Sequence, residues 1–214
     1  MMKTSKLIVF AILSLAVFGQ FSGCCHPAKI SSVGVNLHPQ QRDWWCWAAC
    51  AEMISEYYVH KIVQCDSANY VYNKDHTPDI DCCTGCQGDC PGWGPAWGAY
   101  IYEIKDNWDH WNFTYTYTAS SLSWEDLKKT VSTTSYCGKS PIEAVIPGHV
   151  VVIYGYAEID GNKYISYFDP WEPNCEKVRG NCQPKTGGDD VVTTYDAFKK
   201  IWNHSLYKFK YVGS

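Results

Sequence analysis

The sequence predicts an α+β fold in which helices come first and antiparallel strands follow. Residues 46–59 carry apolar side chains at helical spacing. The later part of the chain contains several β-type runs, and Asp160-Gly161 between two of them is a strong hairpin signal. We therefore expect an N-terminal helical part packed on a C-terminal antiparallel β-sheet.

The predicted helix at 46–59 has the clearest signal, because Ala48, Ala49 and Ala51 are strong helix formers. Asp43 lies just ahead of this helix, where a carboxylate can cap the free N–H groups. Further helices are expected at 65–72, 98–108, 123–133 and 194–203.

Strands are predicted from period-two alternation and from runs of β-branched and aromatic residues. The runs lie at 112–118, 142–146, 149–158, 163–169 and 207–212, with a first strand at 32–37. Residues 73–95 are rich in Gly, Pro, Asp and Cys and predict a loop that needs cross-links to become ordered.

Length and composition predict one folded domain, which we place at residues 37–214 after a tether at 24–36. A chain of 214 residues is long enough for one sizeable core. An aromatic content of 15% is not that of a disordered chain. The formal charge of −4 argues against nucleic acid as the main partner.

Residues 1–23 predict an export signal that is removed from the mature protein. Lys3 and Lys6 precede an apolar segment at 7–18 that is too short to span a bilayer. The small residues before Cys24 resemble a bacterial lipobox, which implies a lipid on Cys24 and attachment to a membrane in the periplasm or at the cell surface. The alternative is an ordinary secretory signal cut near Gly23.

Cysteine is abundant, with twelve residues, and export permits disulfides. Their pairing cannot be deduced from the sequence. The group Cys82, Cys83, Cys86 and Cys90 could also hold zinc, but an oxidising compartment favours disulfides, and we expect neither a metal nor a cofactor.

Three segments carry residues suited to acyl transfer. Cys46 opens the predicted helix, where free N–H groups and the helix dipole favour an anion. His149 begins one strand and Asp169 ends the next, and the hairpin between these strands brings the two side by side. The carboxylate can then orient the imidazole that activates the thiol. Gln40 lies six residues before Cys46, from where its amide could reach a developing oxyanion.

These motifs, Gln-x5-Cys-Trp-Ala-Ala, Gly-His before an apolar run, and Asp-Pro-Trp, resemble the papain-like cysteine peptidases. The match is closer to the bacterial branch of double-glycine-leader peptidases and papain-like effector proteases. The resemblance implies a papain-like fold, Cys46 as nucleophile, His149 as acid/base, Asp169 as its orienter and Gln40 as oxyanion donor. Gln41 is the alternative donor if the loop register differs.

The sequence departs from the family pattern at two points. In papain a Trp directly follows the orienting residue and shields it, whereas here Pro170 comes before Trp171. Typical exporter peptidases have Asp-Cys-Gly at the nucleophile, so their double-glycine rule does not transfer to this chain. Cys50 is expected to bond elsewhere in the chain, because a bridge to Cys46 within one helix would be strained.

Three functions compete at this stage. The first is an exported, monomeric cysteine peptidase acting on polypeptides. The second is an acyl or amide transferase with the same triad, which would give an amide as its major product with an added amine. The third is a catalytically silent, disulfide-rich binding module, in which Cys46 would be oxidised to a partner.

Overall fold

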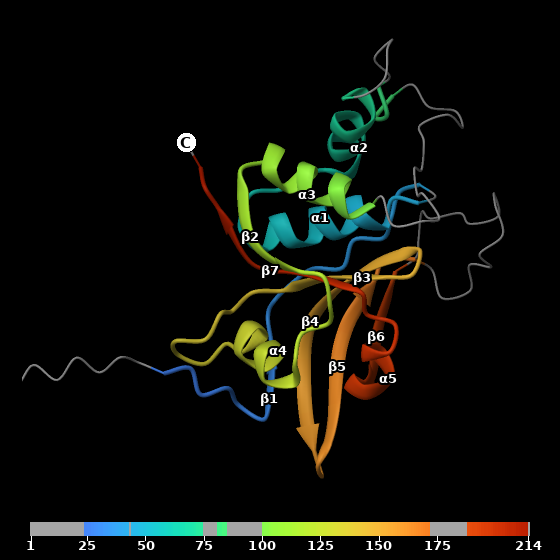
Figure 1. Ribbon diagram of the computed structural model, residues 1–214. Helices are drawn as coiled ribbons and strands as arrows, with labels where there is room; N and C mark the ends of the chain where they lie inside the picture. The colour runs from blue at the N-terminus through green and yellow to red at the C-terminus, as the bar shows by residue number, and fades with distance from the viewer. Residues whose placement is uncertain (1–23, 43, 75–80, 85–99, 172–187, 214) are drawn as a thin grey trace, which may run out of the picture.

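The computed structural model describes residues 24–42, 44–74, 81–84, 100–171 and 188–213. Within these ranges, the helices α1 (Cys46–Tyr57), α2 (Gln64–Asn73) and α3 (Tyr100–His110) lie together over one side of the sheet (Figure 1). The helices α4 (Trp124–Val131) and α5 (Tyr195–Lys199) lie apart from them, beside the strands. None of these helices is long and apolar enough to cross a lipid bilayer.

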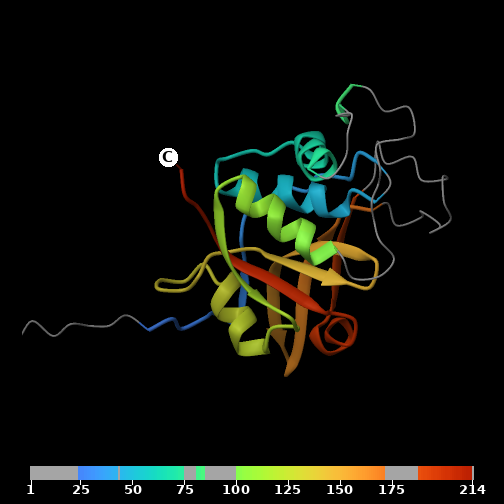
Figure 2. The ribbon, with the colours of Figure 1, turned by 45° about the horizontal axis from the view of Figure 1, so that its top comes forward.

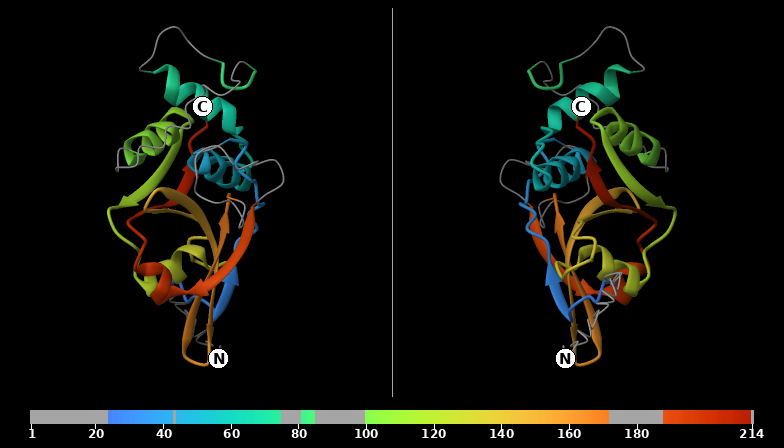
Figure 3. Two further views of the ribbon diagram at one scale, coloured as in Figure 1. Left: turned by 90° about the vertical axis from the view of Figure 1, so that its right-hand side faces the viewer. Right: turned by 90° about the vertical axis from the view of Figure 1, so that its left-hand side faces the viewer.

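The strands form one antiparallel sheet in the order β2-β7-β3-β4-β5-β6, with β1 paired to β4. Figure 3 shows how strongly this sheet is curved. The α+β class predicted from the sequence is confirmed. The strands are β1 (Ile30–Ser32), β2 (Phe113–Thr118), β3 (Ile142–Ile146), β4 (His149–Ile159), β5 (Asn162–Asp169), β6 (Asp189–Thr194) and β7 (His204–Tyr211).

Helix α1 lies in the middle of the core. Its residues 46–55 are all buried. Helix α3 runs beside it over the sheet (Figure 2), and the buried run 150–153 of β4 lies among the core residues. A helix that is buried all round is held by packing rather than by its own propensity. The start of α1 is therefore fixed relative to the start of β4.

The N-terminal segment differs from the prediction. The first strand is Ile30–Ser32 rather than 32–37. It pairs with residues 155–157 of β4, whereas β3 pairs with residues 149–153 of the same strand. A disulfide also joins Cys25 to Cys137. Residues 24–36, expected as a tether, are thus tied into the fold, because β4 is long enough to pair with both β3 and β1 on one edge.

Two C-terminal elements also differ. The predicted helix 194–203 is shorter, Tyr195–Lys199, with the Thr194 hydroxyl capping it, and β7 starts at His204 rather than 207. Strand β6 was not expected, because its sequence Asp-Asp-Val-Val-Thr-Thr has no period-two apolar alternation. The predicted leader at 1–23 lies outside the described residues.

Candidate active site

Cys46 is the first residue of α1 and is nearly buried, with 6% of its surface exposed. The N-cap position is Trp45, which makes no side-chain cap, and the first turn carries no acidic residue. The predicted cap Asp43 lies outside the described residues. The first N–H groups of α1 are therefore free of a competing carboxylate of this helix, which favours an anion at Cys46.

His149 and Asp169 lie at the two ends of a hairpin. Strands β4 and β5 are joined at Asp160-Gly161, where both residues have the positive φ angles that a tight hairpin turn requires. The hairpin brings the start of β4 beside the end of β5. There His149 Nε2 and Asp169 Oδ1 are 2.6 Å apart.

Trp171 covers this pair. Its ring stacks on the His149 ring with the centroids 5.0 Å apart and the planes inclined by 22°. Its backbone N–H donates to Asp169 Oδ1 at 2.9 Å. Pro170 separates Trp171 from Asp169, but the turn at Pro170 brings the Trp171 ring back over the imidazole.

The charge state of His149 follows from its surroundings. Burial of the ring disfavours the charged form, but the charge of the nearby Cys46 and the hydrogen bond to Asp169 outweigh it and raise the pKa of His149 to about 9. The other ring nitrogen, Nδ1, is buried and has no hydrogen-bond partner within the described part of the chain. The arrangement suits an imidazolium paired with a thiolate.

Gln40 lies in the loop that leads into α1 and is fully buried. Its backbone N–H donates to the Pro170 carbonyl at 3.0 Å, and its side-chain Nε2 donates to the Arg42 carbonyl at 3.0 Å. The loop is therefore bonded directly to the turn that follows Asp169. Gln41, the alternative donor, is exposed, and its backbone N–H bonds to Gln64.

Contrary to expectation, Cys50 has no disulfide partner within the described residues and is a fully buried free thiol. Burial, together with the charges of Glu143 and Cys46, raises its pKa well above the ordinary value. Burial also raises the pKa of Glu143 to about 8, against a hydrogen bond from Trp108 Nε1 at 2.6 Å. A thiol held protonated in this way is a poor nucleophile.

The cysteine-rich region contains one described cross-link, between Cys65 and Cys83. These two residues and Asp66 are also grouped closely enough to share a metal ion. Because both sulfurs are consumed by the disulfide, the described part of this region has too few ligands left for zinc. Cys86 and Cys90 lie outside the described residues.

Sequence reasoning missed the residues that hold the Gln40 loop. Gln64 and Glu52 are polar and almost fully buried beneath it. Glu52 pairs with Lys61 at 3.1 Å. The usable signal was a Glu inside an otherwise apolar helix pattern, because a carboxylate at such a position needs a partner.

Comparison with known proteins identifies the family of this chain. Residues 33–204 match the family described as "Peptidase_C39 like family". No curated protein matches the chain. The similar solved structures include two of low identity. The peptidase domain of Streptococcus ComA, a bi-functional ABC transporter involved in a quorum sensing pathway, is 13% identical with a TM-score of 0.45, over 81% of this chain and 97% of that one. A double glycine motif protease from an AMS/PCAT transporter, in complex with the leader peptide, is 17% identical with a TM-score of 0.45, over 87% and 98%.

Proposed function

The chain belongs to the Peptidase_C39 like family and is a cysteine peptidase, and from this premise we propose that it hydrolyses polypeptides outside the cytoplasm through a thioester on Cys46. In this proposal His149 is the acid/base and Asp169 orients it. Gln40 and the backbone N–H of Cys46 donate to the oxyanion. The observation that carries the proposal is the 2.6 Å contact between His149 and Asp169 beside Cys46.

The proposed acylation step uses the thiolate–imidazolium pair. The Cys46 sulfur attacks the carbonyl carbon, a C–S bond forms, and the carbonyl oxygen becomes an oxyanion held by the two donors. As this tetrahedral intermediate collapses, the C–N bond breaks and His149 gives its proton to the departing amine. The products of this step are a thioester on Cys46 and a neutral imidazole.

Deacylation reverses the role of the imidazole. His149 takes a proton from a water molecule as its oxygen attacks the thioester carbon. The second tetrahedral intermediate collapses with cleavage of the C–S bond, which releases the carboxylic acid and restores the thiolate and the imidazolium. Asp169 keeps one ring nitrogen protonated throughout, so that the other is free to exchange the proton. The stacked Trp171 supports the proposal, because it limits the access of water to this ion pair.

The direct test is selective alkylation of Cys46. In the folded protein with its disulfides intact, iodoacetamide is expected to label Cys46 at neutral pH far faster than Cys50 or Cys82, which are also free and buried. The reason is that only Cys46 has an imidazolium partner. His149→Ala is expected to slow the labelling by about tenfold or more, since the thiol then loses that partner. Mass spectrometry of the digested protein gives the site and extent of labelling.

The same digests separate this proposal from the competing ones. An unlabelled Cys46 in folded protein, or a Cys46 found in a disulfide, would count against the peptidase and favour a binding module. With an added amine during turnover, the free acid is expected as the major product, whereas a transferase would give the amide.

Export and lipid attachment form the second part of the proposal. The Cys25–Cys137 disulfide supports an oxidising compartment, and Cys24 directly precedes it as an exposed residue. We expect protein purified from the membrane fraction of a bacterial host to carry its lipid on an N-terminal Cys24. Intact-mass analysis measures this, and Cys24→Ala serves as the matched variant that should move to the soluble fraction. An unmodified chain that starts before Cys24 would contradict it.

A further inference from the structure

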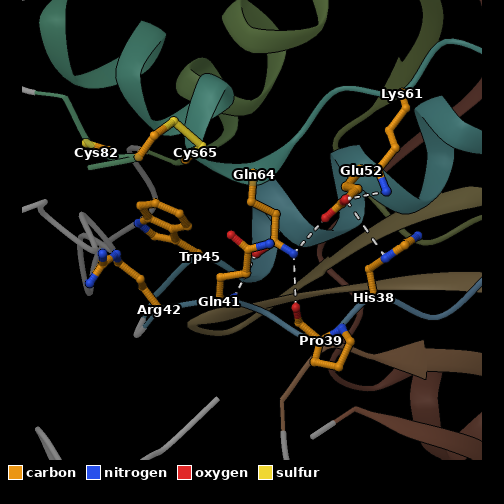
Figure 4. Close-up of a pocket in the computed structure, with 11 residues that line it drawn as sticks. His38, Pro39, Gln41, Arg42, Trp45, Glu52, Lys61, Gln64, Cys65 and Cys82 are labelled. Carbon is orange, nitrogen blue, oxygen red and sulfur yellow. Dashed lines mark hydrogen bonds and ion pairs between the residues drawn. A yellow bond between two sulfur atoms is a disulfide. The ribbon is translucent and has the colours of Figure 1, made fainter. Parts of the chain in front are cut away.

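Gln64 bonds to the backbone on both sides of Gln40. Gln64 is the first residue of α2 and only 1% exposed. Its Oε1 accepts from the N–H of Gln41 at 2.8 Å, and its Nε2 donates to the carbonyl of Pro39 at 3.0 Å. One side chain therefore holds the two peptide groups that flank Gln40. Figure 4 shows the bonds from Gln64 to Pro39 and Gln41.

Both polar groups of the peptide bond between Pro39 and Gln40 are hydrogen-bonded. Its carbonyl, that of Pro39, bonds to Gln64, and its N–H, that of Gln40, bonds to the Pro170 carbonyl at 3.0 Å. Pro170 follows directly after Asp169. The loop is thus hydrogen-bonded to Gln64 of α2 on one side and to Pro170, which follows Asp169, on the other.

Glu52 connects Gln64 to the helix of Cys46. Gln64 Nε2 also donates to Glu52 Oε2 at 2.9 Å, and Glu52 lies on α1 with 4% of its surface exposed. Lys61 Nζ lies 3.1 Å from the other carboxylate oxygen, which supplies the partner that a buried carboxylate needs. Figure 4 shows these contacts as a continuous network from α1 to the loop.

The three hydrogen bonds at position 64 require a glutamine side chain. A glutamine amide offers two N–H donors and an acceptor oxygen. Here the amide nitrogen donates to Pro39 and Glu52, and the oxygen accepts from Gln41. A methionine has nearly the same length but makes none of these bonds. An asparagine keeps the polar atoms but is one methylene too short to reach all three partners.

We propose that Gln64 is a positioning residue for acyl transfer, which sets where the Gln40 amide lies relative to Cys46. This inference rests on the proposed function, in which Gln40 donates to the oxyanion. An oxyanion donor works only when it lies about 2.7–3.1 Å from the developing charge, so a small shift of the loop has a large effect on that step. Cys46 lies on α1 and His149 pairs with Asp169 at the ends of β4 and β5, so a reaction at the sulfur that forms no oxyanion does not need the Gln40 amide.

Two probes of Cys46 separate these effects. p-Nitrophenyl acetate acylates the sulfur through a tetrahedral oxyanion and releases p-nitrophenolate. Iodoacetamide alkylates it by direct displacement of iodide and forms no oxyanion. In the full chain, Gln64→Met is expected to slow acylation by about 10- to 100-fold. The rate of alkylation and its pH profile should stay within about twofold of the wild type.

A double variant tests whether Gln64 acts through Gln40. Gln40→Ala combined with Gln64→Met should acylate no more slowly than Gln40→Ala alone, because the second change then has no donor left to displace. Asn107→Leu is the matched control. It removes another buried amide, that of Asn107 on α3, which is 1% exposed and accepts from Trp111 Nε1 rather than bonding to the Gln40 loop.

The outcomes distinguish the inference from the proposed function. If Cys46 of the wild type reacts with neither probe, the proposed function fails. If Cys46 reacts but Gln64→Met slows both probes equally, or if its effect adds to that of Gln40→Ala, Gln64 is only structural and the inference is overturned. If Gln64→Met does not fold, Gln64→Asn takes its place, with slowed acylation and unchanged alkylation expected and wild-type acylation contradicting the proposal.

Discussion

Replacement of Cys46 by serine is expected to reduce the turnover of a denatured, fluorescently labelled casein by about 10⁴-fold or more. The serine hydroxyl occupies the same position at the start of α1, but it does not ionise beside His149 as a thiol does. Because the sulfur forms the thioester in the proposed mechanism, the loss should appear in kcat. Initial rates at saturating casein measure it.

The matched control for this experiment is Cys50→Ala. Cys50 lies one helical turn further along α1, is fully buried, and has a pKa raised by burial and by neighbouring acids. Its replacement should leave turnover within about threefold of the wild type, with both variants checked for folding by circular dichroism. A Cys46→Ser variant that kept a tenth of the activity would contradict the thioester mechanism.

Removal of the Trp171 ring is expected to shift the alkaline limb of activity to lower pH. The ring stacks on His149, so Trp171→Ala admits water to the His149–Asp169 contact. Water reduces the burial of the imidazole and screens the charges that act on it. The pKa of His149 should fall from about 9 toward its ordinary value near 6.5. If it falls to about 7, the protonated fraction of His149 at pH 8 drops by about tenfold.

The pH profile of kcat/KM on casein measures this shift, and Trp44→Ala is the matched control. The Trp44 ring lies 6.3 Å from that of Trp171, whereas the ring stacked on His149 is Trp171 itself. Trp44→Ala should therefore leave the alkaline limb where it is. An unchanged limb in Trp171→Ala would mean that the ring does not control the charge state of His149.

The raised pKa of His149 also predicts the direction of a stability effect. A group whose pKa is higher in the folded state stabilises that state fully below its unfolded pKa, here about 6.5, and loses the contribution as the pH rises through about 9. The difference in melting temperature between Trp171→Ala and the wild type should accordingly be larger at pH 6 than at pH 10. The packing lost with the indole affects both pH values alike.

The helix of Cys46 and the β4–β5 hairpin could be predicted because their signals are local. Three alanines and an apolar helical pattern mark α1, and Asp160-Gly161 marks the turn of the hairpin. The contact between His149 and Asp169 follows from that hairpin. A single local feature was therefore sufficient to relate two residues of the candidate site to each other.

Residues that act through the backbone of distant segments could not be predicted in this way. Gln64 bonds to the main chain of Pro39 and Gln41, and a main-chain partner leaves no pattern in the sequence. Trp171 was doubted because of Pro170, since the path of the chain through that turn depends on its surroundings. Strand β6 was missed because its pairing with β5, rather than its composition, makes it a strand.

The Cys25–Cys137 disulfide has a consequence for survival among other proteases. It closes a covalent loop across 112 positions of sequence, within which α1, α2 and α3 all lie. A backbone cut anywhere inside this loop opens the ring but releases no fragment, because both new chains remain joined through the sulfur bridge. The piece that bears Cys46 would stay bound to the sheet that bears His149 and Asp169, and nicked enzyme would remain one molecule until it is reduced.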